Sequence, residues 1–171
     1  MIQDAALRTL ILSTLLLVLS GCGFSLRGND ALSVNFSELQ FYSEQPNSEL
    51  ARLLRRSLDG AEVNVTLVNL GEEDSKLALL GIANEQLISR PVTINSRARA
   101  AQTELRLSVD MALMLDEQTL LEPETLFVER TYFQDIENLS GNQEEAEIIS
   151  AEMRRELINQ MMRRLAAIEP I

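Results

Sequence analysis

Strict alternation of apolar and polar residues over 103–115 is the feature that most constrains how this chain folds. One set of alternate positions is apolar but for its first member: Thr103, Leu105, Leu107, Val109, Met111, Leu113 and Leu115. The positions between them begin with Glu104, Arg106, Ser108 and Asp110. Because successive side chains of a strand point to opposite faces, the pattern predicts one long strand. One face would lie on a core, and the other would be wet or docked on something polar.

Shorter patterns on either side predict the rest of a sheet. We expect strands at 38–42, 63–67 and 125–133, and a central strand buried on both faces at 77–82. Pro91 forbids a regular interior strand position, yet Val92 and Ile94 alternate, so 83–95 is interpreted as a bent or bulged continuation. Turns are expected at 71–75 and 116–119.

Two segments have the 3.6-residue period of amphipathic helices. The first starts at a cap, Asn47 or Ser48, and stops at Gly60. Its apolar stripe consists of Leu50, Leu53, Leu54 and Leu58. Its arginines, Arg52, Arg55 and Arg56, occupy the other side of the helix. The second covers about 143–168 after a cap at Ser140 or Asn142, with the stripe Ile149, Met153, Leu157, Met161, Leu165 and Ile168. The predicted fold is therefore α+β, a two-layer sandwich of two helices packed on one face of a four- to five-stranded mixed sheet.

The stretch Leu19-Ser20-Gly21-Cys22 separates an apolar leader from a polar chain. The apolar run 9–19 follows Arg8 and is too short to span a bilayer, which is typical of a signal peptide. The site resembles a bacterial lipobox, which is cut before the cysteine, whose sulfur then carries a diacylglyceryl group. The alternatives are a plain transmembrane helix and ordinary secretion, which would leave a free thiol at the new terminus.

These features divide the chain into a cleaved signal peptide (1–21), a lipidated tether (22–33) and a single domain (34–171). Acyl chains on Cys22, palmitate among them, would hold the domain on a membrane. By the sorting rule of Gram-negative lipoproteins, Gly23 after the cysteine, rather than Asp, indicates the outer membrane.

Composition argues against an enzyme. The chain has no histidine, one cysteine (Cys22) and one lysine (Lys76). The lack of histidine excludes Ser–His and Cys–His catalysis and histidine-ligated metal sites. We therefore expect no catalytic residues, no metal and no cofactor apart from the lipid on Cys22. The net charge of −11 argues against nucleic acid as the main partner.

Three arginines form the candidate ligand site. Arg97 and Arg99 lie at the entry to the longest predicted strand, and Arg90 comes just before Pro91. Arginine binds phosphate through bidentate, charge-assisted hydrogen bonds, so this group is a candidate site for a phosphorylated glycolipid. The alternative is that the same arginines pair with the surplus acids of the chain.

The stretch from Cys22 to Gly28, Cys-Gly-Phe-Ser-Leu-Arg-Gly, resembles the mature N-terminus of the LPS-assembly lipoprotein LptE family, which typically reads Cys-Gly-aromatic-x-Leu-Arg. The similarity continues through the order of strands and helices, Thr131-Tyr132-Phe133 and Arg163-Arg164-Leu165. The resemblance implies a protein that is not an enzyme. It implies a lipoprotein that sits largely inside the LptD β-barrel at the outer membrane, plugs it, assists its assembly and binds lipopolysaccharide.

The resemblance also implies a basic lipopolysaccharide-contact position before the long central strand, which Arg97 or Arg99 matches. A second basic position of the family, before the last helix, has no counterpart in Ser140-Gly141-Asn142-Gln143. We therefore expect a lipid anchor on the periplasmic face of the outer membrane, with LptD and lipopolysaccharide as partners. Two alternatives remain: a lipid-binding auxiliary lipoprotein of another envelope transport system, and a periplasmic hydrolase, which the lack of histidine disfavours.

Overall fold

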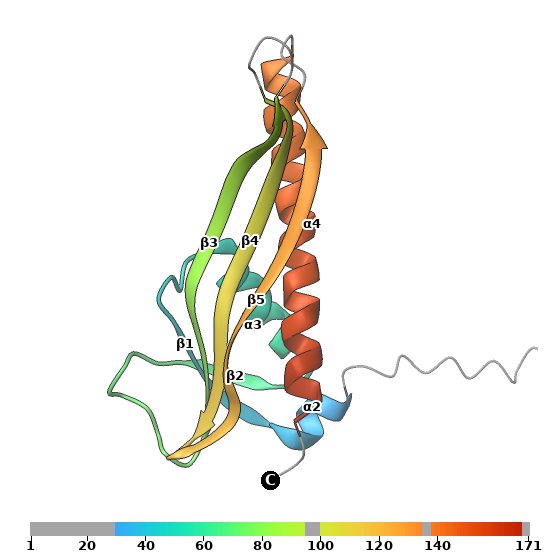
Figure 1. The fold of residues 1–171 in the computed structure, drawn as a ribbon. Coiled ribbons are helices and arrows are strands. Elements are labelled where there is room, and N and C mark those ends of the chain that lie inside the picture. Colours follow the sequence, from blue (N-terminus) through green and yellow to red (C-terminus); the bar gives the residue numbers. More distant parts are fainter. Residues whose placement is uncertain (1–29, 95–99, 135–137, 169–171) are drawn as a thin grey trace, which may run out of the picture.

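The computed structural model describes residues 30–94, 100–134 and 138–168. In chain order its elements are α2 (Asp30–Asn35), β1 (Glu38–Ser43), α3 (Glu49–Asp59), β2 (Asn64–Leu67), β3 (Ala78–Ile94), β4 (Ala100–Leu115), β5 (Gln118–Phe133) and α4 (Leu139–Ala166). The three long strands β3, β4 and β5 run beside α4, whereas α2, α3, β1 and β2 gather in the lower half of Figure 1. The predicted α+β fold, with helices on a mixed sheet, is confirmed, and the sheet has five strands.

The strand order in the sheet is β2-β1-β3-β4-β5. β1 pairs in parallel with both β2 and β3, whereas β3, β4 and β5 pair antiparallel. A parallel pair needs a crossover connection, and α3 provides it between β1 and β2. The tight turn at 116–117 joins β4 to β5, with Asp116 at a positive φ of 51°, a conformation that Asp adopts more readily than most residues.

The first helix forms as predicted. The Ser48 hydroxyl oxygen accepts a hydrogen bond from the Ala51 N–H at 3.0 Å, which caps the start of α3. Leu50, Leu54 and Leu58 are fully buried. The apolar stripe therefore faces the sheet, as the spacing of the leucines requires.

The second helix, α4, starts four residues earlier than predicted. Its cap is Asn138, whose side-chain oxygen accepts from the Gly141 N–H at 3.0 Å, in place of the predicted Ser140 or Asn142. A Cβ at position 141 would lie 2.4 Å from Asn138 Nδ2, so glycine leaves room for this cap. Gly141, which precedes the predicted start of the helix at about 143, lies inside the first turn of α4.

β3 continues without interruption through the stretch that contains Pro91. Its register with β4 shifts between Ala83 and Gln86 and again after Pro91, which confirms the bulged continuation. The expectation that 77–82 is buried on both faces is wrong, because Leu80 and Ile82 are buried but Leu79 is only half-buried. The helices cover one face of the sheet only, and we call the other the open face.

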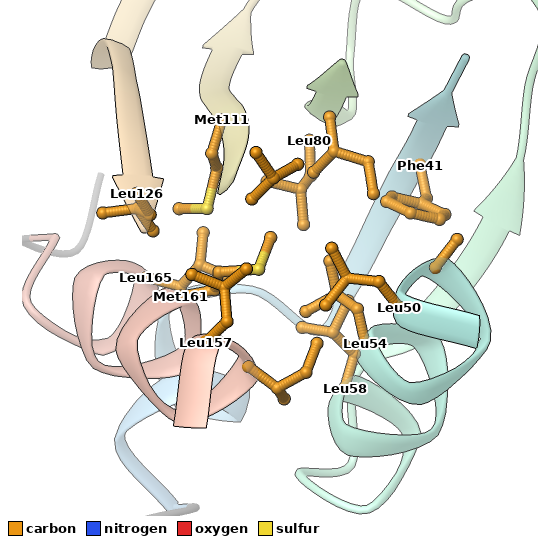
Figure 2. Close-up of a cluster of buried hydrophobic side chains, with 14 of the residues drawn as sticks. Phe41, Leu50, Leu54, Leu58, Leu80, Met111, Leu126, Leu157, Met161 and Leu165 are labelled. Carbon is orange, nitrogen blue, oxygen red and sulfur yellow. The ribbon is translucent and has the colours of Figure 1, made fainter. Parts of the chain in front are cut away.

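The core lies between the sheet and the helices (Figure 2). Apolar side chains of four strands meet the stripes of both helices: Phe41, Leu80, Met111 and Leu126 against Leu50, Leu54, Leu58, Leu157, Met161 and Leu165. Burying one such side chain contributes roughly 1.5–3 kcal/mol to stability. This layer therefore fixes the long strands against α4.

One element, α2, was not predicted. Residues 30–33 belong to the expected tether, yet the structure folds them into α2, and Leu32 is buried in the core. Asn35 Nδ2 donates a hydrogen bond to the Ile168 carbonyl at 2.7 Å, which ties α2 to the end of α4. The folded part therefore begins before residue 34, and the rest of the tether and the leader lie outside the described residues.

Candidate functional site

The structure describes only one of the four predicted site residues. Cys22, Arg97 and Arg99 lie outside the described ranges, so the lipidation site and two of the three candidate arginines stay predictions. Arg97 and Arg99 fall in the stretch 95–99, between the end of β3 and the start of β4. Arg90 lies on β3, four residues before that strand ends.

Arg90 takes part in an ion pair. Its Nε donates to Glu104 Oε1 of β4 at 2.6 Å, and 64% of the Arg90 side chain is exposed. The hydrogen bond to Glu104 and its charge raise the pKa of Arg90 above the usual arginine value. For this residue the structure thus shows the alternative, pairing with an acid, although most of the side chain is exposed.

Arg90 and Glu104 belong to a row of polar contacts across the open face of β3, β4 and β5. We call it the polar ladder; its members are Asn84, Arg90, Glu104, Arg106, Asp110, Thr125 and Glu129. Arg106 Nη1 donates to Glu129 Oε1 at 2.6 Å. Asn84 Nδ2 and the Thr125 hydroxyl both donate to Asp110, the first at 2.7 Å, and these bonds lower the pKa of Asp110.

Apolar side chains stand among the members of the polar ladder. Ile88 on β3 is 47% exposed, and Phe127 and Phe133 on β5 are 45% and 71% exposed. Phe127 and Phe133 alternate along β5 with Leu126, Val128 and Tyr132, which are buried on the helix face. Mixed aromatic and paired polar groups are typical of protein interfaces.

Gln40 is a buried polar residue that the sequence pattern alone does not reveal. Only 2% of it is exposed, although it lies between Leu39 and Phe41 of β1 on the opposite side of the strand. Its Nε2 donates to the carbonyls of Asp74 and Leu77 at 2.7 and 3.1 Å, and its Oε1 accepts from the Asp74 N–H at 2.7 Å. It therefore fixes the acidic loop before β3 against the open face.

A groove of about 550 Å³ opens on the helix face where β3 extends beyond α3. Leu87, Leu105 and Tyr132 supply apolar walls, and Arg154 of α4 pairs there with Glu49, the first residue of α3, at 3.2 Å. The groove arises because α3 is short, so α4 alone covers the far part of the sheet. Only the packing reveals it, since its lining residues come from five elements, α3, β3, β4, β5 and α4.

The described residues offer no metal site and no membrane span. Nowhere in 30–94, 100–134 and 138–168 do three or more His, Cys, Asp or Glu side chains gather as metal ligands would. Across the same ranges, no helix has the length and apolar character needed to cross a membrane.

Comparison with known proteins places this geometry among lipoproteins. The family model described as LptE, Lipopolysaccharide-assembly, matches residues 36–165. The "LPS-assembly lipoprotein LptE" of Photorhabdus laumondii is 29% identical over 160 residues, which cover 94% of this chain and 85% of that protein. The protein of the same name from Yersinia pestis is 28% identical over 160 residues, 94% of this chain and 75% of that one.

Solved structures share the fold. The rare lipoprotein B of Shewanella oneidensis superposes with a TM-score of 0.66 at 21% identity, covering 76% of this chain and 94% of that one. The uncharacterized lipoprotein B of Nitrosomonas europaea gives 0.62 at 22% identity, with 85% and 91% covered. The fold of this chain thus recurs in proteins whose sequences are only 21–22% identical to it.

Proposed function

The chain belongs to the LptE family, and we propose that it serves in lipopolysaccharide assembly as a lipoprotein of the outer membrane, anchored through Cys22. The family match over residues 36–165 carries this proposal, since it spans nearly the whole described domain. The lipobox-like Leu19-Ser20-Gly21-Cys22 supports the anchor, because acyl chains on the cysteine attach a folded domain to a bilayer.

The partner in this proposal is the LptD β-barrel, with the chain as its plug and as an aid to its assembly. Two features of the molecule support it. The long blade of β3, β4, β5 and α4 has an elongated shape (Figure 1). Its open face carries the polar ladder, which suits the polar interior of a large outer-membrane barrel better than it suits lipid.

The ligand in this proposal is lipopolysaccharide, bound rather than chemically changed. Arg97 and Arg99 would meet its phosphates, and Arg90 of β3 precedes Arg97 by seven residues in the chain. Arginine provides five N–H donors in a fixed fork and stays charged, so it recognises phosphate without any proton transfer. The chain needs no catalytic residue for this role.

Co-purification tests the proposal. The lipidated chain, tagged at its C-terminus, is extracted from outer membranes in mild detergent and its partners are identified by mass spectrometry. We expect one large β-barrel protein in a 1:1 ratio. A second envelope lipoprotein of the same preparation, tagged alike, controls for barrels that bind any lipoprotein.

A preparation without a stoichiometric barrel would contradict the partnership with LptD. Co-purification with components of a different transporter would favour the alternative, an auxiliary lipid-binding lipoprotein of another envelope system. The open face gives a further check. Cysteines introduced at Phe127 and Phe133 should cross-link to the barrel, whereas one at the exposed Glu152 of α4 should cross-link less.

A further inference from the structure

The arginines of α3 differ from most of the other arginines that the structure describes, although Arg155 and Arg163 of α4 also lack a described carboxylate in ion-pair distance. Five of those others each pair with a glutamate: Arg90, Arg106, Arg130, Arg154 and Arg164. Within the described part of the chain, no carboxylate lies in ion-pair distance of Arg52, Arg55 or Arg56. This is unexpected in a chain of net charge −11, where acids outnumber basic residues by 26 to 15.

The three arginines lie together. Positions 52, 55 and 56 have the spacing i, i+3, i+4, which places their side chains on one face of the helix, away from the buried leucines. They line a hollow of about 440 Å³ over the edge strand β2, together with Asp59 and Val65. Like charges at this spacing destabilise a helix, so the cluster costs stability unless an anion joins it.

The cluster lies near the end of the molecule where the described chain begins. Ser57 and Gly60, from the end of α3, share a second hollow with Leu32 of α2. α2 starts at Asp30, eight residues after Cys22. Eight extended residues reach at most about 28 Å, so a lipid on Cys22 would hold this end of the domain close to the membrane.

We infer that Arg52, Arg55 and Arg56 bind the anionic phospholipid headgroups of the membrane that holds the lipid anchor. The inference rests on the proposed lipidation of Cys22, because the anchor brings α3 to the bilayer surface. An acyl anchor combined with a basic patch is a common two-part membrane attachment. The acyl chains keep the domain at the membrane, and the arginines set the direction in which the long blade points.

The negative charge of the rest of the domain does not cancel this attraction. The acidic loop at 72–74 is fixed by Gln40 on the open face, so the sheet separates it from α3. At physiological ionic strength, exposed charges are screened beyond about 8 Å. Asp59 is the acid that lines the same hollow, and three guanidinium groups outweigh its one carboxylate.

Vesicle binding of the mature chain without its lipid tests the inference. The protein comprises residues 22–171 with Cys22→Ser, which includes every described residue. It is sedimented with phosphatidylcholine vesicles that contain either no or 25% phosphatidylglycerol, at 50 and 300 mM salt. Each basic residue near an anionic surface raises partitioning roughly fivefold, so Arg52→Gln/Arg55→Gln/Arg56→Gln should weaken binding at least about tenfold.

The matched control is Lys76→Gln/Arg130→Gln/Arg155→Gln, which also removes three positive charges, but from exposed positions elsewhere on the domain. We expect it to bind the anionic vesicles nearly as well as the unchanged chain. Glutamine is a good helix former, and circular dichroism with thermal melting verifies that both variants fold.

Equal losses in the two variants, or equal binding to neutral and anionic vesicles, would overturn the inference. So would binding of a phosphorylated glycolipid through the α3 arginines without any binding to phospholipid vesicles. The proposed function is tested separately, because the barrel should co-purify with the α3 variant if only membrane contact is lost. Failure of barrel co-purification in the unchanged chain would leave the vesicle result standing.

Discussion

The guanidinium of Arg106 lies over the ring of Phe127, with 4.0 Å between Arg106 Cζ and the ring centroid. The same guanidinium donates to Glu129, two residues further along β5. Arg106 thus joins β4 to β5 by two kinds of contact on the open face. Because no helix covers this face, cross-strand side-chain contacts of this kind are what stabilises the arrangement of its side chains.

A double-mutant cycle measures the Arg106–Phe127 contact. We expect a coupling free energy of about 0.5–1 kcal/mol between Arg106→Ala and Phe127→Ala, the usual range for an exposed cation–π pair. Arg106→Lys should retain less than half of it, because an ammonium lacks the planar surface that stacks on a ring. Urea unfolding supplies the free energies, and strictly additive effects of the two alanine substitutions would contradict the contact.

Asp110 predicts a pH dependence of stability. Hydrogen bonds from Thr125 and Asn84 lower the pKa of Asp110 in the folded chain. Its contribution is therefore present above the unfolded value, near 3.9, and is lost as the pH falls through the lower folded value. Asp110→Asn should reduce stability at pH 6, and the difference from the unchanged chain should shrink toward pH 2.

Urea midpoints measured between pH 2 and pH 6 provide the test of the Asp110 prediction. Glu117→Gln, in the exposed turn between β4 and β5, is the control for removing one carboxylate. A difference for Asp110→Asn that stays constant over this pH range would show that the hydrogen bonds do not depend on its charge.

The sequence predicted the elements whose periodicity is strong. The alternation over 103–115 and the leucine stripe of α3 appear in the structure as predicted, because each pattern suits only one burial geometry. Pro91 was also interpreted correctly, since a bulge is one of the few ways in which a strand tolerates proline. Predictions fail where one residue type fits two local structures. Glycine is typical of loops, but Gly141 lies in the first turn of α4 and leaves room for the Asn138 cap, so the helix starts earlier than predicted.

Less of the candidate site followed from the sequence. Gln40 occupies a position that alternation assigns to solvent, and only the loop that folds back from Asp74 buries it. Whether the α3 arginines form ion pairs likewise depends on which carboxylates the fold brings near them. Such facts arise from contacts between residues far apart in the chain, which periodicity does not encode.

Gln40→Leu should destabilise the domain by about 1–3 kcal/mol. The substitution leaves the Asp74 N–H and the carbonyls of Asp74 and Leu77 without the partner that satisfies them. Gln40→Glu should be more harmful, because a carboxylate would face two carbonyl oxygens. Gln86→Leu, an exposed glutamine of β3, is the control, and unchanged urea midpoints for both Gln40 variants would contradict the role of this side chain.

Charge reversal at Arg97 and Arg99 tests the proposed lipopolysaccharide contact. Arg97→Glu/Arg99→Glu should weaken binding of phosphorylated lipid A by about tenfold or more, since each charge-assisted hydrogen bond lost contributes about 1.5–3 kcal/mol. Dephosphorylated lipid A should bind the variant and the unchanged chain alike. Lys76→Glu/Arg155→Glu makes the same change of net charge elsewhere, and an equal loss in this control would assign the effect to overall charge.

Cys22→Ala tests the anchor. Without the thiol no diacylglyceryl group can be attached, so the chain should leave the membrane as a soluble periplasmic form or remain as an unprocessed precursor. Fractionation and mass measurement of the N-terminus distinguish these outcomes. Ser25→Ala, three residues after Cys22, should leave both the cleavage and the lipid mass unchanged. Firm membrane retention of a Cys22→Ala chain whose leader has been removed would contradict lipid anchoring, because neither the proposed barrel contact nor the α3 arginines should withstand a wash at high salt and alkaline pH.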